Sequence, residues 1–162
     1  MRRVALAIGV GLGIGKVRYF PGTAGTLWGV LVYIIVALLG ASWWWYIGIL
    51  AVVFLAGVWA SGRCEVLLGQ KDHPSIVIDE VAGLLITLLG ISFSPLALIV
   101  GFGLFRLFDI VKPFSIRRLQ ALPGGWGVMV DDVAAGLAAN LVLRLIFVAS
   151  TWVQPIIIMS RT

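Results

Sequence analysis

The acidic side chains of this sequence are few and lie in one part of the chain. All seven fall between Glu65 and Asp132 of 162 residues. Five of them stand where long apolar segments begin or end: Asp79, Glu80, Asp109, Asp131 and Asp132. An ionised carboxylate is costly there unless it is paired or bound to a cation, although helix capping explains any single one equally well. Five together would repel one another, and an all-oxygen ligand set favours Mg²⁺ over Zn²⁺, so we expect a Mg²⁺ site.

Groups suited to binding phosphate occur in two other segments. The run 21–26 (Pro-Gly-Thr-Ala-Gly-Thr) leads directly into an apolar segment. Thr23 and Thr26 would therefore lie at a helix N-terminus, where free N–H groups and the helix dipole attract anions. The alternative is an ordinary helix start with one of these threonines as N-cap.

Arg106, Asp109 and Lys112 follow one another at intervals of three residues. Arg106 and Asp109 would share a helix face and could pair, so the group is either a phosphate site or a salt bridge at the membrane interface. His73, the single histidine, is expected near the same face, where it either assists or caps its own loop.

Residue counts exclude several phosphatase mechanisms. One histidine cannot supply both a nucleophile and a separate acid, and Cys64 does not begin a C-x5-R loop. No D-x-D-x-T/V sequence is present for an aspartyl-phosphate intermediate of the usual kind. Metal-assisted attack by water remains, with the five carboxylates as metal ligands and one of them as a candidate base.

The elements that must position these groups are membrane helices. The chain is 61% hydrophobic and 12% charged, with a mean hydropathy of +1.11, which leaves too little polar surface for a soluble domain. We predict a single domain over residues 1–162, an all-α polytopic bundle. A tight hairpin is expected at Ala41-Ser42 and a break at 92–95. The five expected membrane helices, of which the middle two are short for a full span, are 24–40, 43–60, 81–91, 96–111 and 133–153.

The N-terminal segment and the basic residues predict the topology. Residues 1–16 resemble a signal peptide but have no small-x-small cleavage site, so we expect a retained interfacial or re-entrant segment. Lys and Arg concentrate before the first span and in the two long loops, which places these and the carboxylates on the cytoplasmic side. The basic residues are scattered, so anionic lipid, and not nucleic acid, is the expected partner of the +5 charge.

A stripe of small and polar residues lies on the last predicted helix. Asp132, Gly136, Asn140 and Arg144 recur every fourth residue, and Gly83 is placed similarly on an earlier helix. Small residues let helices approach closely, which would bring the carboxylates of different helices together or serve packing alone.

Four segments in order resemble the phosphatidylglycerophosphatase A family. They are 21–27, 75–83, 105–113 and 124–136, within a resemblance that runs from about residue 8 to 145. The family consists of bacterial inner-membrane, Mg²⁺-dependent phosphatases that convert phosphatidylglycerophosphate into phosphatidylglycerol. The resemblance therefore implies this activity, a phospholipid substrate and a helical bundle around a central helix. One departure, Phe114-Ser115 where the family has Trp-Pro, removes no charged group.

Two alternatives remain open at this point. A small cation transporter would place acidic residues mid-span or at both faces, whereas here they lie at one face. Another Mg²⁺-dependent enzyme of phospholipid synthesis, a CDP-alcohol phosphotransferase, would need a D-G-x2-A-R…G-x3-D-x3-D pattern that is absent. The sequence makes no prediction about oligomeric state.

Overall fold

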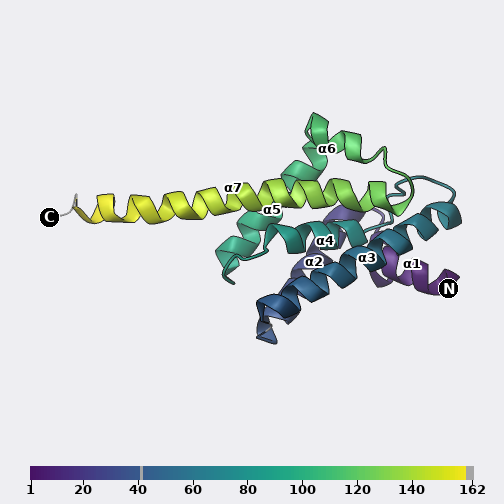
Figure 1. The fold of residues 1–162 in the computed structure, drawn as a ribbon, viewed down its shortest axis with the longest axis horizontal. Coiled ribbons are helices and arrows are strands. Elements are labelled where there is room, and N and C mark those ends of the chain that lie inside the picture. The colour runs from purple at the N-terminus through teal and green to yellow at the C-terminus, as the bar shows by residue number, and fades with distance from the viewer. Residues whose placement is uncertain (41, 160–162) are drawn as a thin grey trace.

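The computed structural model describes residues 1–40 and 42–159, with the side chains of 1–40, 42–113 and 116–148 (Figure 1). These residues form α-helices and one 3₁₀ helix, η1, and contain no strand, which confirms the all-α prediction. The elements in chain order are α1 (Arg2–Gly9), η1 (Gly11–Lys16), α2 (Pro21–Leu38), α3 (Trp43–Leu68), α4 (Ile78–Thr87), α5 (Pro95–Val111), α6 (Phe114–Leu119) and α7 (Gly125–Met159).

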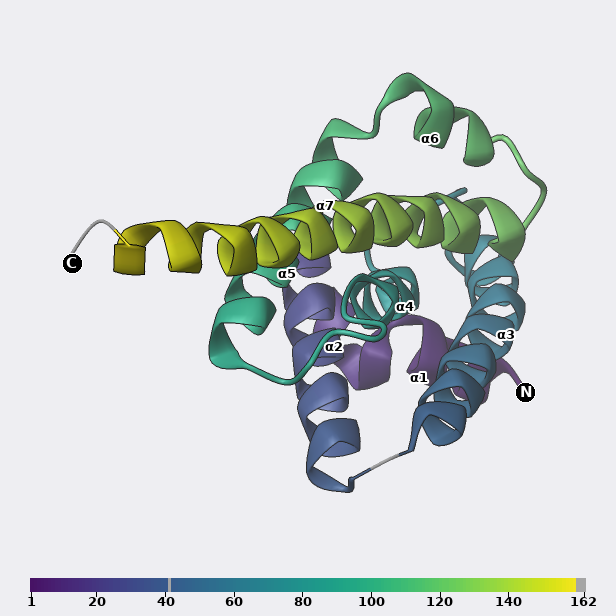
Figure 2. The same ribbon diagram turned by 60° about the vertical axis from the view of Figure 1, so that its left-hand side comes forward.

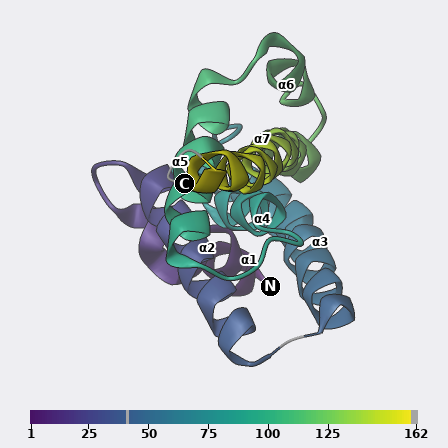
Figure 3. The ribbon, with the colours of Figure 1, turned by 90° about the vertical axis from the view of Figure 1, so that its left-hand side faces the viewer.

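Helix α4 is the centre of the bundle. All ten of its residues are buried, as is expected of a helix that is apolar on every side except at its first turn. It packs against α2, α3, α5 and α7, and Figure 2 shows it end-on between α2 and α3 with α7 crossing above. The predicted tight hairpin is therefore wrong in its packing, because α2 and α3 spread apart around α4 (Figure 3). Ala41, at its tip, lies outside the described residues.

Two of the five predicted membrane helices are long and apolar enough to cross a membrane. Among the described residues these are α2 and α3. Helix α4 has 10 residues and α5 has 17, both short of the ~20 that a full span requires. The predicted break between them is confirmed: Pro95 opens α5, and the Ser94 hydroxyl caps it by accepting from the Ala97 N–H at 3.1 Å. Helix α6 was not predicted.

The N-terminal segment folds back onto the bundle, with α1 packed on α3 and η1 packed on α2. Gly9 lets α1 and α3 approach, since a Cβ there would lie 2.6 Å from Cys64 Sγ. The helix then breaks at Leu12 and Gly13, both with positive φ, so the segment forms no straight helix.

The glycines of the predicted stripe bring α7 into contact with α4. A Cβ on Gly136 would collide with the carbonyl oxygen of Gly83, and one on Gly83 would collide with the Phe105 ring. Farther along α7, Asn140 Nδ2 donates to the carbonyls of Thr87 (2.8 Å) and Leu89 (3.0 Å), at the C-terminal end of α4. The stripe therefore fixes the register of α7 against α4 and determines which of their side chains meet.

Replacing Gly136 by alanine should destabilise the protein, because the added methyl group has no space against Gly83. We expect a loss of about 1–3 kcal/mol in the free energy of unfolding, measured by thermal unfolding in detergent. Gly103→Ala is the matched control: its Cβ meets nothing within 4 Å, so helix propensity should leave it as stable as the wild type or more so. Equal melting temperatures for the two variants would contradict this view of the α4–α7 contact.

Candidate metal and phosphate site

Three buried carboxylates meet where α4 and α7 cross. Asp79 and Glu80 lie in the first turn of α4, and Asp132 lies near the start of α7. One ligand oxygen from each is within 4.8 Å of the other two, a spacing that a single metal ion can bridge. The three residues are 7%, 9% and 2% exposed. This triad is part of the predicted group of five, and the Gly83–Gly136 contact explains why the two helices bring it together.

Each member of the triad has an oxygen without a hydrogen-bond partner among the described residues. These buried atoms are Asp79 Oδ1, Glu80 Oε2 and Asp132 Oδ2. A buried polar atom left unpaired costs about 1–3 kcal/mol, and more when it is charged. A divalent cation would satisfy all three at once, and hard carboxylate oxygens suit Mg²⁺. The residues present therefore fit the predicted metal site.

Burial also makes the charged form of the triad unfavourable. It raises the pKa of Asp79 and of Asp132 well above the usual aspartate range, and the charges of neighbouring carboxylates add to the effect. Burial is also the main cause that raises the pKa of Glu80 to about 8. Three buried anions in contact need compensation from protons or from a cation, and a metal ion would supply it.

Asp109 and Asp131 lie beside the triad and are paired with basic side chains. Arg106 Nη1 donates to Asp109 Oδ2 at 2.6 Å and lies 4.0 Å from Glu80 Oε1. Lys112, at the C-terminal cap of α5, places Nζ 2.5 Å from Asp131 Oδ2 and 3.4 Å from Asp109 Oδ1. The same nitrogen is 3.7 Å from Asp132 Oδ1. Geometry thus divides the five predicted carboxylates into two groups: the triad, and two carboxylates that pair with basic side chains.

The predicted phosphate loop reaches this cluster. A Cβ on Gly22 would lie 2.5 Å from Glu80 Oε1 and 3.0 Å from Arg106 Nη1, so the backbone at Gly22 comes close to both side chains. Helix α2 starts at Pro21, and its first backbone bond runs from Ala24 N–H to Phe20 O, so the N–H groups of Gly22 and Thr23 precede it. These donors and the positive end of the α2 dipole lie beside Arg106, an arrangement suited to an anion.

Two other predicted residues make local contacts. The Thr26 side chain is fully buried, and its hydroxyl donates to Gly22 O one turn earlier at 2.9 Å. His73 Nδ1 accepts from the Ser75 N–H at 3.1 Å, within its own loop. This hydrogen bond corresponds to loop capping, one of the two roles expected of His73.

Sequence reasoning missed a contact between two loops beside the site. Gln120 Nε2, after α6, donates to Asp72 Oδ2 at 3.2 Å, and Glu65 Oε1 accepts from the Asp72 N–H at 2.8 Å. The charge of Asp72 is one of the influences that raise the pKa of Asp79. No local pattern marks these residues, because their contact depends on how α6 returns the chain to α7.

A family model and two relatives of this chain point to the same protein family. The model of the family described as phosphatidylglycerophosphatase A matches residues 7–147. A phosphatidylglycerophosphatase A of Haemophilus influenzae is 40% identical over 84% of this chain and 84% of its own length. One from Escherichia coli is 32% identical over 87% of this chain and 81% of its own length.

A third relative has a different name. A protein of Bacteroides thetaiotaomicron, 37% identical over 85% of this chain and 90% of its own length, is called "Putative phosphatidylinositol-3-phosphatase". No solved structure gives a significant match. The family match covers all four motifs and the whole acidic cluster, so this chain belongs to the phosphatidylglycerophosphatase A family of lipid phosphatases.

Proposed function

We propose that this chain is a Mg²⁺-dependent phosphatidylglycerophosphatase, which hydrolyses phosphatidylglycerophosphate to phosphatidylglycerol and phosphate. The observation that carries the proposal is the buried triad Asp79, Glu80 and Asp132, whose unpaired oxygens lie beside Arg106 and the start of α2. A group that binds a cation and a group that binds an anion are thus adjacent, as hydrolysis of a phosphate monoester requires.

The triad would hold the metal ion, which when bound polarises the phosphoryl group and activates water. The Arg106 guanidinium and the Gly22 and Thr23 N–H groups would bind the phosphoryl oxygens of the substrate. Asp109 would orient Arg106 through their 2.6 Å hydrogen bond. Lys112 would hold Asp131 and Asp109 and neutralise charge in the site. Asp131 Oδ1 is buried and has no hydrogen-bond partner among the described residues, so it is the candidate proton acceptor.

A lipid substrate agrees with the place of the site in the bundle. The triad lies at the ends of α4 and α7, beside the start of α2, and α2 and α3 are the candidate spans. With the N-terminus and long loops at the cytoplasmic face of a bacterial inner membrane, the headgroup could reach the triad while the acyl chains stay in the bilayer. One clustered site also fits an enzyme better than a cation transporter, which needs groups along a path across the membrane.

The relative from Bacteroides thetaiotaomicron supports a second candidate substrate, phosphatidylinositol 3-phosphate. Both lipids present a phosphate monoester on a glycerophospholipid headgroup, so the triad and Arg106 would serve either. The family model and two relatives favour phosphatidylglycerophosphate.

An assay with both lipids tests the activity and the substrate together. Purified protein in mixed micelles should release phosphate from phosphatidylglycerophosphate with Mg²⁺ and lose that activity with EDTA, and excess Mg²⁺ should restore it. We expect phosphatidylinositol 3-phosphate to be hydrolysed at least tenfold more slowly in kcat/KM, a discrimination of about 1.4 kcal/mol. Release that is unaffected by EDTA would refute the metal dependence, and the reverse preference would replace the substrate.

A further inference from the structure

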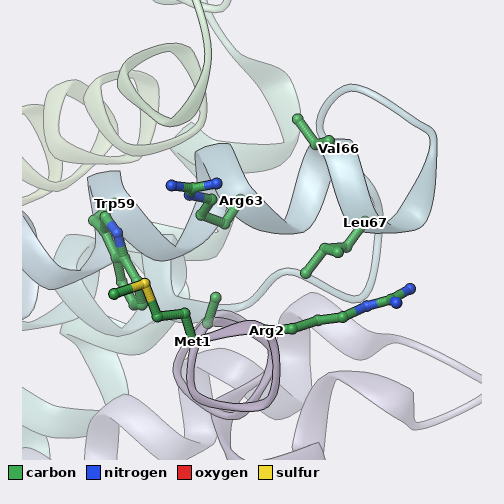
Figure 4. A pocket seen from close by; sticks show the side chains of 7 residues that line it. Met1, Arg2, Trp59, Arg63, Val66 and Leu67 are labelled. Atoms are coloured by element: carbon green, nitrogen blue, oxygen red, sulfur yellow. The ribbon is translucent and has the colours of Figure 1, made fainter.

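A groove separate from the acidic site lies between α1 and the C-terminal half of α3. It encloses about 130 Å³. Apolar side chains, among them Met1, Trp59 and Leu67, form its centre, and Arg2 and Arg63 are its charged residues. Figure 4 shows Arg63 above the groove with its guanidinium turned toward Trp59, and Arg2 extending past Leu67, so cations flank the apolar lining on two sides.

The charge of this groove is uncompensated. No carboxylate lines it, and the ion pairs found in the described part of the chain all involve Arg106 or Lys112. A second hollow on the other side of α1 is lined by Arg3 and Lys16, again with no acid. Helix α1 therefore lies between two hollows that combine apolar walls with positive charge, which is the complement of an anionic, amphipathic ligand.

The surroundings of the groove favour a membrane lipid over a soluble anion. Helix α3 is a candidate span, its exposed Val66 lines the groove, and the exposed apolar side chains Val52 and Leu55 precede Trp59 on the same helix. A free phosphate would leave the wall of Trp59 and Leu67 unused. A phospholipid would contact both the apolar wall and the arginines, since its acyl chain covers apolar surface while its phosphate meets an arginine.

We propose that the α1–α3 groove binds an anionic phospholipid as a ligand distinct from the substrate. The contacts of α1 connect this groove to the acidic site: Cys64 Sγ donates to Ala5 O at 3.4 Å, and the Val77 N–H donates to Gly9 O at 2.9 Å. Val77 is the N-cap of α4, directly before Ile78, Asp79 and Glu80. A lipid held at α1 would thus fix the start of α4 at the depth of the headgroups.

Photolabelling in nanodiscs tests the groove directly. The full chain is reconstituted with phosphatidylglycerol or phosphatidylcholine that carries a diazirine on one acyl chain, and labelled peptides are mapped by mass spectrometry. We expect phosphatidylglycerol to label residues 1–5 and 59–67 roughly tenfold more than phosphatidylcholine does, because each arginine near the surface attracts the anionic lipid. Equal labelling by the two lipids would overturn the proposal.

Variants separate the groove from the catalytic site, where the same probe could also bind. R2A/R63A should lose about tenfold of the groove labelling and keep its labelling near residues 79 and 132, whereas R2K/R63K, with both charges retained, should keep most of both. Circular dichroism checks that each variant is folded. Undiminished groove labelling in R2A/R63A, or an equal loss in R2K/R63K, would show that the two charges do not hold a lipid.

Discussion

Replacing Asp132 by asparagine should lower phosphate release by roughly 10³-fold or more. The substitution keeps the size of the side chain but removes the charge of one of three carboxylates whose oxygens lie within 4.8 Å of one another. A metal ion bound there supplies several kcal/mol of charge stabilisation in the transition state, and each 1.4 kcal/mol is tenfold in rate. The rate is measured with saturating Mg²⁺, so that loss of the site is distinguished from weakened binding.

The stability of the same variant provides an independent readout. Because Asp132 is buried next to like charges, D132N should unfold at the same temperature as the wild type or higher when no metal is present. Glu65→Gln is the matched control: it removes a carboxylate outside the cluster and keeps the oxygen that accepts from the Asp72 N–H. E65Q should release phosphate at a rate near that of the wild type. A D132N enzyme as active as E65Q would exclude a metal role for the triad.

Replacing Arg106 by glutamine should lower kcat/KM for the lipid by about 10²–10³-fold. Its guanidinium lies between Asp109 and Glu80 and next to Gly22, where a phosphoryl group would meet the start of α2. Losing one preorganised donor to developing negative charge has this effect in enzymes where it has been measured. The measurement is steady-state hydrolysis of phosphatidylglycerophosphate in mixed micelles.

Two comparisons distinguish phosphate binding by Arg106 from a purely structural salt bridge. Arg117→Gln, at an exposed position of α6, removes the same charge away from the triad and should have little effect. Asp109→Asn keeps Arg106 and an acceptor oxygen beside it but removes the charge of its partner, so it should cost less, about 10–100-fold. An Asp109→Asn variant impaired as much as R106Q, with both equally destabilised, would reduce the pair to a structural role.

The sequence singles out the residues of the candidate site, but it could not predict how they divide into groups. Asp79, Glu80, Asp109, Asp131 and Asp132 stood out because carboxylates are costly at the ends of apolar segments. Which three form the triad depends on the crossing of α4 and α7 at Gly83 and Gly136. Lys112, expected to bind phosphate, contacts Asp109 one turn earlier on its own helix and Asp131 19 residues later, and no local pattern could indicate the second contact.

The helices were predictable in type and less so in arrangement. The predicted break at 92–95 was read from Pro95 and its serines, because proline opens a helix and serine caps it. The hairpin was wrong because a short connection limits only the ends of α2 and α3, and the apolar surface of α4 separates the rest. Helix α3 continues to Leu68, beyond the predicted end at Ala60, since Ser61, Arg63 and Glu65 are tolerated where the helix leaves its apolar stretch.

Metal binding to the protein, measured without substrate, addresses the role of the triad most directly. Mn²⁺ stands in for Mg²⁺, and its electron paramagnetic resonance signal reports free ion during titration of the purified protein. Saturable binding that Mg²⁺ displaces is predicted for the wild type and for E65Q, with loss of that binding in D79N and D132N. Saturable binding that persists unchanged in both variants, or none in the wild type, would contradict a metal site at Asp79, Glu80 and Asp132.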